Sequence, residues 1–164
     1  MSTREEWLAR LDAVEARLAD HAGDGAPPGL TDPDPPTGER WDAGQVWAHL
    51  AEFLPYWMGQ LTKVVTAFRG EAVPFGRTKK DAGRIAAIEA RRAEDPAALM
   101  AEVRGHVAVW RSWLAGLDGS AWSAVGAHPT LGELDMDAML RHFVVGHLEE
   151  HADQLDGLRA APPS

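Results

Sequence analysis

The chain has 164 residues and a formal net charge of −9 at pH 7. This length predicts one domain over residues 1–164, and the negative charge argues against nucleic acid or an anionic membrane surface as a partner. The absence of cysteine excludes disulfides, thiolate nucleophiles and cysteine-ligated zinc, so any thiol chemistry requires a thiol from outside the chain. The N-terminal stretch MSTREEWLARL has no apolar signal segment, and no run of about 18 apolar residues follows it, so we expect a cytoplasmic protein.

A first helix is predicted over residues 3–21, where apolar side chains recur at helical spacing and charged ones fill the other positions. Its apolar stripe comprises Trp7, Leu11, Val14 and Leu18. A capping box opens this helix, made either by Ser2 with Glu5 or by Thr3 with Glu6. His21 falls in the last turn, where the helix dipole favours a cation, and is therefore expected at the surface.

Residues 22–40 are rich in glycine, proline and aspartate, which exclude a helix or a central strand there. We interpret them as a long connection and not as a linker that detaches the first helix, because that helix cannot bury its stripe alone. A second helix is predicted from Asp42, a favourable N-cap, to about Phe68. It carries His49 on the flank of its apolar face, and Pro55 should bend it just past that residue.

Residues 71–80 are predicted as a loop, followed by a short helix over residues 81–92. Asp95-Pro96 marks the start of a third long helix, which ends near Leu117. Residues 118–134 carry several turn signals and are expected to be irregular, with a short extended pair as an option. Asp135 then caps a last helix that runs to about Arg159. Four long amphipathic helices with almost no strand signal predict an all-α bundle.

Two histidines, His147 and His151, lie four residues apart in the last predicted helix, within the stretch RHFVVGHLEEHADQL. This spacing places both imidazoles on one helical face, where apolar side chains also point. Either both are core histidines satisfied by hydrogen bonds, or both bind one metal ion, and a third ligand elsewhere would favour the metal. The string also matches the H-x-x-E-H zinc-protease pattern, with Glu150 as general base. We regard that match as accidental, because the pattern needs a ligand well downstream and only 13 residues follow His151.

The remaining histidines are expected to lie outside such a site. His142 points about 140° away from His147 around the helix and should face solvent. His128 belongs to a turn with Pro129. His106 lies close to the apolar face of the third long helix, where we expect a half-buried side chain and keep it as an outside candidate for a ligand.

The segment ERWDAGQVWAHLAEFLPYW resembles the opening of the second helix in the DinB-like superfamily, where a tryptophan precedes a helix with an apolar-Ala-His-Leu box. Trp41 is that tryptophan here, and the box is Trp47-Ala48-His49-Leu50. The end of the chain is also similar, with the motifs Gly132-Glu133-Leu134, His147-x-x-x-His151 and Asp153-Gln154-Leu155. The resemblance covers essentially the whole chain and is near the N-terminal domain of the mycothiol-dependent maleylpyruvate isomerases.

The resemblance implies a four-helix bundle with long crossover connections, in which His49, His147 and His151 bind a divalent metal ion such as zinc or nickel. It also implies a thiol S-transferase or isomerase that uses an external thiol, such as mycothiol, on a small electrophile. Three neutral imidazoles leave a coordination position open, as in catalytic sites, where a bound thiol or water loses its proton more easily.

Glutamates near the three histidines are candidates for a catalytic or supporting role, namely Glu52 and either Glu149 or Glu150, and Tyr56 is a candidate for lining a pocket. Two other functions stay open. One is a metal-bearing binding or structural protein without turnover, with a homodimer through Trp110 or Trp113 as an option. The other is a metal-dependent hydrolase. The expected partners are a small-molecule substrate and a thiol.

Overall fold

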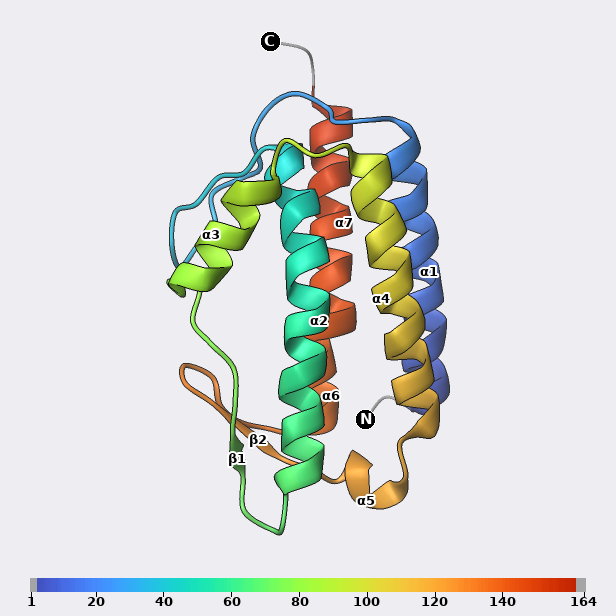
Figure 1. Cartoon of the computed structure of the whole chain (residues 1–164), viewed down its shortest axis with the longest axis vertical. Coiled ribbons are helices and arrows are strands. Elements are labelled where there is room, and N and C mark those ends of the chain that lie inside the picture. Colours follow the sequence, from blue (N-terminus) through green and yellow to red (C-terminus); the bar gives the residue numbers. More distant parts are fainter. Residues whose placement is uncertain (1–2, 162–164) are drawn as a thin grey trace.

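Four long helices lie side by side in the computed structural model, which describes residues 3–161 (Figure 1). They are α1 (Arg4–Gly23), α2 (Ala43–Ala67), α4 (Pro96–Gly116) and α7 (Val145–Ala160). The shorter elements are α3 (Ala82–Arg91), α5 (Gly119–Trp122), α6 (Met136–Met139) and the π-helical turn η1 (Leu140–Val144). Within this described range, no helix combines the length and the apolar character needed to cross a membrane. The predicted all-α four-helix bundle is confirmed.

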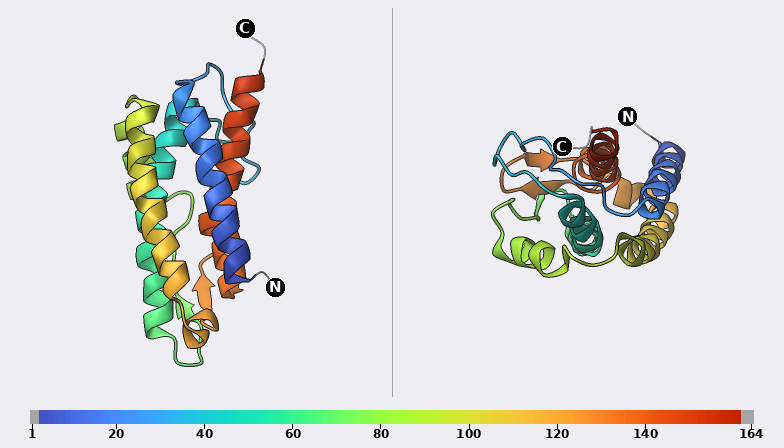
Figure 2. Two further views of the ribbon diagram at one scale, coloured as in Figure 1. Left: turned by 90° about the vertical axis from the view of Figure 1, so that its right-hand side faces the viewer. Right: turned by 90° about the horizontal axis from the view of Figure 1, so that it is seen from above.

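The long helices form a square in which chain order does not follow the perimeter. Both α1 and α2 contact α4 and α7, so α1 and α2 lie diagonally opposite each other, as the view from above shows (Figure 2). In Figure 1, α1 and α7 run upward and α2 and α4 run downward. Residues 24–42 and 117–135 must therefore each connect diagonal helices, which confirms the long crossover connections.

Acidic and hydroxyl side chains begin the helices where the sequence predicts. Thr3 with Glu6 and Asp42 with Gln45 form capping boxes at α1 and α2, while the alternative cap Ser2 lies outside the described residues. Single caps are made by Asp81, Asp95, Asp118 and Asp135. Each such cap stabilises its helix by about 1 kcal/mol, because it satisfies a backbone N–H that the helix leaves without a partner.

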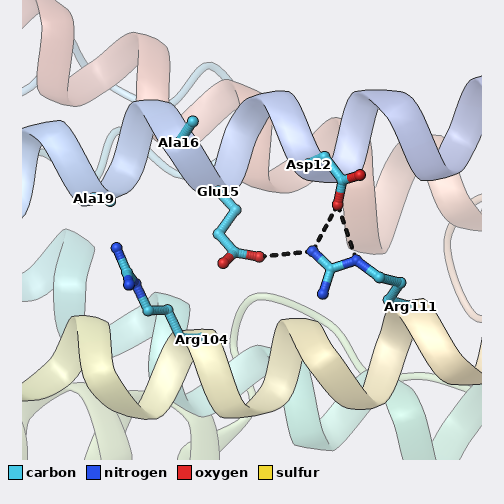
Figure 3. Close-up of a pocket in the computed structure, with 6 residues that line it drawn as sticks. All are labelled: Asp12, Glu15, Ala16, Ala19, Arg104 and Arg111. Carbon is cyan, nitrogen blue, oxygen red and sulfur yellow. Dashed lines mark hydrogen bonds and ion pairs between the residues drawn. The ribbon is translucent and has the colours of Figure 1, made fainter.

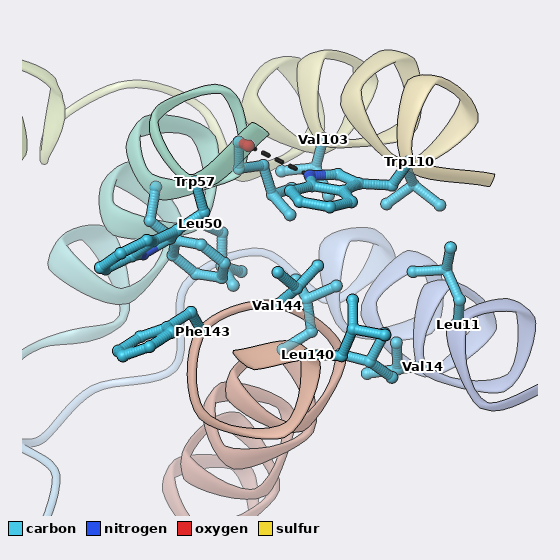
Figure 4. Packing of buried hydrophobic residues seen from close by; sticks show 14 of the residues in the cluster. Leu11, Val14, Leu50, Trp57, Val103, Trp110, Leu140, Phe143 and Val144 are labelled. Carbon is cyan, nitrogen blue, oxygen red and sulfur yellow. Dashed lines mark hydrogen bonds between the residues drawn. The ribbon is translucent and has the colours of Figure 1, made fainter. Parts of the chain in front are cut away.

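Apolar faces from all four long helices and from η1 fill the interior (Figure 4). Trp7, Trp47 and Trp110 are among the largest fully buried side chains. The indole of Trp110 on α4 donates a hydrogen bond to the carbonyl of Leu54 on α2, at 3.1 Å. Helix α2 continues through Pro55, which follows Leu54, and the bend expected there stays a prediction.

A small sheet lies beside the lower half of α2 (Figure 1). Its strands are β1 (Val73–Pro74), β2 (Gly126–His128) and β3 (Gly132–Leu134). The antiparallel β2–β3 pair confirms the extended pair expected within residues 118–134. The parallel pairing of β1 with β2 corrects the prediction that residues 71–80 form only a loop. A two-residue strand has no local signal, because its formation depends on a partner more than 50 residues away in the chain.

The last predicted helix is not continuous. The π turn η1 inserts one extra residue between α6 and α7, and the N–H of Val145 donates to the carbonyl of Leu140, five residues earlier. A Cβ added at Gly146 would lie 2.0 Å from the carbonyl oxygen of Arg141. Glycine is therefore the residue that this turn accommodates, and the prediction of one regular helix from Asp135 to Arg159 was wrong here.

Candidate metal centre

Three histidine side chains meet between α2 and α7. His49 comes from α2, while His147 and His151 come from successive turns of α7. The Nε2 atom of His147 lies 3.1 Å from Nε2 of His49 and 3.2 Å from Nε2 of His151. The possible ligand atoms of these residues all lie within 4.8 Å of one another. The structure thus brings together the three residues that the sequence indicated, in a group that could hold a metal ion.

Each of these imidazoles faces an oxygen atom three residues further along its own helix. From the Nδ1 atoms, the pairs are His49 with Glu52 (3.0 Å), His147 with Glu150 (3.2 Å) and His151 with Gln154 (2.7 Å). Because carboxylate and amide oxygens accept hydrogen bonds, each Nδ1 is assigned the proton and each Nε2 presents a lone pair. Three converging lone pairs repel one another unless a cation lies between them.

A proton is poorly suited to be that cation. Burial lowers the pKa of both His49 and His151 well below the usual 6.5, and charge on His147 would lower each further. Neutral imidazoles are the form in which histidine binds metals. Nitrogen atoms about 2.0–2.1 Å from a tetrahedral zinc ion lie roughly 3.3–3.4 Å apart. The observed separations of 3.1 and 3.2 Å fit such a donor set with only a small outward movement of the rings.

Aromatic side chains pack against the three histidines of the centre. Trp41 stacks on His151, with ring centroids 5.9 Å apart and planes inclined by 14°. The ring of Phe53 lies 4.9 Å from that of His49 and 4.6 Å from that of His147. The His49 side chain is 4% exposed and that of His147 is 19% exposed. Solvent therefore reaches the centre along His147.

Glu52, one of the predicted catalytic candidates, contacts His49 and fixes the orientation of its ring. Its side chain is only 9% exposed, with Oε2 facing His49 and Oε1 in an ion pair with Arg77. Burial raises the pKa of Glu52, and the Arg77 guanidinium opposes that shift. Both carboxylate oxygens are engaged, so this side chain orients His49 and is poorly placed to take a proton from a reactant.

The other two candidates lie in different surroundings. The guanidinium of Arg77 covers the ring of Tyr56 at 3.8 Å from its centroid, and burial raises the pKa of this phenol above 10, so it stays protonated at neutral pH. Glu150 lies on the open side of the centre, with its side chain 69% exposed next to His147. Of the predicted candidates, Glu150 is thus the carboxylate that an incoming molecule reaches first.

Sequence reasoning missed two supporting residues. Gln154 was noted only as part of the chain's final motif, although the spacing repeated by His49–Glu52, His147–Glu150 and His151–Gln154 could have revealed its role. Arg77 carries no such signal, because its approach to Glu52 depends on the path of the segment between α2 and α3. Glu149 ion-pairs with Arg10 of α1 instead of supporting a histidine.

The histidines outside the centre have different environments. His142 is exposed and His106 is half-buried on α4, as expected. His21 corrects the surface prediction, since it is 4% exposed and its Nε2 lies 2.6 Å from a carboxylate oxygen of Asp156. His128, predicted to belong to a turn with Pro129, is buried and is the last residue of strand β2. In both cases the contact that buries the ring comes from a distant part of the chain.

Two surface hollows lie away from the centre. One, of about 350 Å³, lies between α1 and α4, where Arg111 binds Asp12 and Glu15 and Arg104 extends toward α1 (Figure 3). The other, of about 190 Å³, lies near the end of α1 and is lined in part by His21 and Trp47. Neither is lined by a histidine of the centre, so neither supplies a binding pocket for its chemistry.

Residues 33–155 match the family model of the DinB superfamily. The chain belongs to the DinB superfamily. No curated protein matches it significantly. This assignment confirms the resemblance seen in the motifs around His49 and in the last helix, because the matched range includes all three histidines.

Solved structures share this fold at low sequence identity. YfiT from Bacillus subtilis, described as a probable metal-dependent hydrolase with an unusual four-helix bundle topology, is 19% identical with a TM-score of 0.71, over 96% of this chain and 87% of its own. A histidine-to-alanine mutant of the mycothiol-dependent maleylpyruvate isomerase is 15% identical with a TM-score of 0.67, over 94% of this chain and 61% of its own. An uncharacterised protein from Clostridium difficile 630 is 8% identical with a TM-score of 0.64, over 97% and 96% of the two chains.

Proposed function

We propose that this DinB-superfamily protein is a divalent-metal-dependent transferase or isomerase that uses an external low-molecular-weight thiol on a small electrophile. The convergence of three imidazole Nε2 atoms, each with its Nδ1 held by an oxygen acceptor, carries the proposal. Imidazole donors of this kind suit zinc or nickel. The chain contributes no thiol of its own, since it lacks cysteine, and one protein of the same fold is a mycothiol-dependent isomerase.

Different residues of the chain would bind that ion, orient the histidines and exclude water. His49, His147 and His151 would hold it, and when bound it would make a thiol or water at its open position more acidic. Glu52, Glu150 and Gln154 keep each Nδ1 protonated and each Nε2 directed inward. Trp41 and Phe53 exclude water from the inner side, so a reactant approaches along His147. Glu150 lies at that edge and accepts from Nδ1 of His147, on the side of the ring away from Nε2, so it supports this histidine at the solvent boundary.

A metal-dependent hydrolase is the second candidate. It is favoured by the structural similarity to YfiT, which is described as a probable hydrolase of that type. The same three histidines would serve both reactions, because the open position of such a site holds either water or a substrate. The two functions differ in the nucleophile, so supplying or withholding a thiol separates them.

The test is a comparison of nucleophiles on the zinc- or nickel-loaded protein. Mycothiol, bacillithiol and glutathione are each incubated with chlorodinitrobenzene, whose chloride leaves as the thiolate sulfur bonds to the ring carbon. A nitrophenyl ester without thiol tests hydrolysis in parallel. His151→Ala, treated with the same metal, is the matched control because it lacks one imidazole.

Thioether formation that requires both metal and His151 supports the thiol-dependent function. Ester cleavage without thioether formation supports the metal-dependent hydrolase instead of the thiol-dependent function. A protein that binds metal but is inert in both assays is a metal-binding protein without these activities. Failure of the wild type to bind zinc or nickel overturns the proposal itself.

A further inference from the structure

The three histidines of the centre are not held equally firmly. Glu150, which accepts from His147, is 69% exposed, whereas Glu52, which accepts from His49, is only 9% exposed. The two oxygens of Glu52 have separate partners, because Oε2 faces Nδ1 of His49 and Oε1 pairs with a guanidinium nitrogen of Arg77. A carboxylate bound at both oxygens has a fixed plane, which in turn fixes the ring that donates to it.

Arg77 is itself nearly enclosed. Its side chain is 11% exposed, and its guanidinium lies between the Glu52 carboxylate and the face of the Tyr56 ring. Both Glu52 and Tyr56 lie on α2, one turn apart, so Arg77 lies across that face of the helix beside His49. This arrangement combines an ion pair with a cation–π contact, and the planar fork of arginine suits both.

Three hydrogen bonds fix the backbone that carries Arg77. The N–H of Phe75 donates to Ala127 of β2 at 3.1 Å, and the N–H of Gly76 donates to the side chain of Gln60 on α2 at 2.8 Å. The carbonyl of Arg77 lies 3.1 Å from Nε2 of His128, also on β2. The segment before α3 is therefore tied both to the small sheet and to α2.

Two details show how closely His128 and this segment fit. Nδ1 of His128 accepts from the backbone N–H groups of Thr130 and Leu131, at 3.2 and 3.3 Å, so Nε2 carries the hydrogen that Arg77 accepts. Gly76 has φ +91°, and a Cβ there would lie 2.6 Å from Cδ2 of His128. Only glycine allows this backbone conformation and this approach of the ring.

We infer that Arg77 is a positioning residue of the metal centre: it fixes Glu52, Glu52 fixes His49, and the sheet with His128 holds Arg77 in place. The inference rests on the proposed metal binding, but it concerns the chain's own contacts. It assigns the small sheet a role, because the sheet supplies the anchor for the segment that reaches the centre. His49 is then the pre-oriented ligand, and His147 at the open edge is the adaptable one.

A purely structural role for Arg77 would have a different outcome. If the residue only tied the α2–α3 segment to α2, its loss would lower the thermal stability of the metal-free protein and leave metal affinity almost unchanged. A positioning role predicts instead that loss of Arg77 weakens metal affinity and leaves the thermal stability of the metal-free protein almost unchanged, because affinity depends on the direction of one imidazole. Measurements of both quantities on the same variants therefore separate the two roles.

The experiment measures the zinc dissociation constant by competition with a chromophoric chelator, together with unfolding of the metal-free protein. Arg77→Gln should weaken zinc binding by about 10–100-fold, the usual cost of removing a partner of a metal ligand. Arg77→Lys should recover part of this loss, because the charge is kept but the fork is not. Arg91→Gln is the matched control, since Arg91 pairs with Glu94 and Glu102 on the exposed surface and should leave affinity unchanged.

A double-mutant comparison tests whether Arg77 acts through Glu52. In a Glu52→Gln background, adding Arg77→Gln should change the zinc dissociation constant by no more than about twofold, because the contact has already been removed. In the metal-free protein, the His49 Nδ1–H resonance should be protected from exchange in the wild type and lost in Arg77→Gln. Wild-type zinc affinity in Arg77→Gln, or independent losses in the double variant, would overturn the inference. Absence of zinc binding by the wild type would instead overturn the proposed function, with the resonance still testing the contact.

Discussion

Because of the π turn before α7, we predict that alanine destabilises the protein at Gly146 and stabilises it at Gly157, although both glycines belong to the same helix. In Gly146→Ala, the new Cβ would lie 2.0 Å from the backbone oxygen of Arg141, whereas real Cβ atoms essentially never approach within 3.0 Å. The backbone must therefore move by about 1 Å, which we estimate as overpacking that costs about 1–3 kcal/mol. Gly157→Ala meets nothing within 4 Å on an exposed position. It should stabilise the protein by about 0.5–1 kcal/mol, the usual gain of alanine over glycine in a helix.

The assay is urea unfolding of the metal-free variants. These ranges give a difference of about 1.5–4 kcal/mol between the two variants. With a slope near 2 kcal/mol per molar urea, it separates their midpoints by roughly 0.8–2 M. If Gly146→Ala instead closes the π turn into a regular helix, residues on its two sides rotate by about 100° relative to one another, and zinc affinity falls. A Gly146→Ala midpoint at or above that of the wild type, with the slope unchanged, would refute the reasoning.

The remaining predictions concern histidines. His147→Ala and His151→Ala should each lose zinc or nickel binding, as measured by metal analysis. In thermal scans, the unfolding temperatures of the metal-free variants should change by only a few degrees, because the core is apolar. Full unfolding of the protein on metal removal would contradict this prediction. His106→Gln on α4 should leave metal stoichiometry at the wild-type value, measured in the same analysis. Burial lowers the pKa of His128, so the folded state resists protonation of this residue. In urea titrations, the free energy of unfolding of the wild type should therefore fall relative to that of His128→Gln as the pH drops below about 6.5. Parallel plots of unfolding free energy against pH for the two proteins would exclude this effect.

Features with a local cause could be predicted from the sequence. The caps at Thr3, Asp42 and Asp135 are local because each side chain accepts from an amide three residues away. The pairing of His147 with His151 follows from helical geometry alone. The addition of His49 did not come from such geometry, and required the resemblance to a family whose motifs recur in this chain.

Features with distant partners could not be predicted in this way. His21 is buried because Asp156 of α7 lies beside it, and its own helix end carries no sign of that contact. The contact of Arg77 with Glu52 depends on β1 pairing with β2, which places a short segment from before α3 against α2. The π turn has a local trace in Gly146, but glycine alone does not distinguish a wide turn from an ordinary helix.

The order of the packed helices along the chain determines when during biosynthesis the parts of the centre come together. His49 and His147 are 98 residues apart in the chain. At about 5–20 residues per second, a ribosome adds the second of them roughly 5–20 s after the first. During that interval the nascent chain has one imidazole of the three. Helix α1 lacks its neighbour α7 throughout, and it also lacks its other neighbour α4 until about residue 116 has been added. Synthesis of the final helix thus completes the four-helix arrangement and supplies the other two of the three proposed ligands, so all three histidines could bind one metal ion only after that helix has been made.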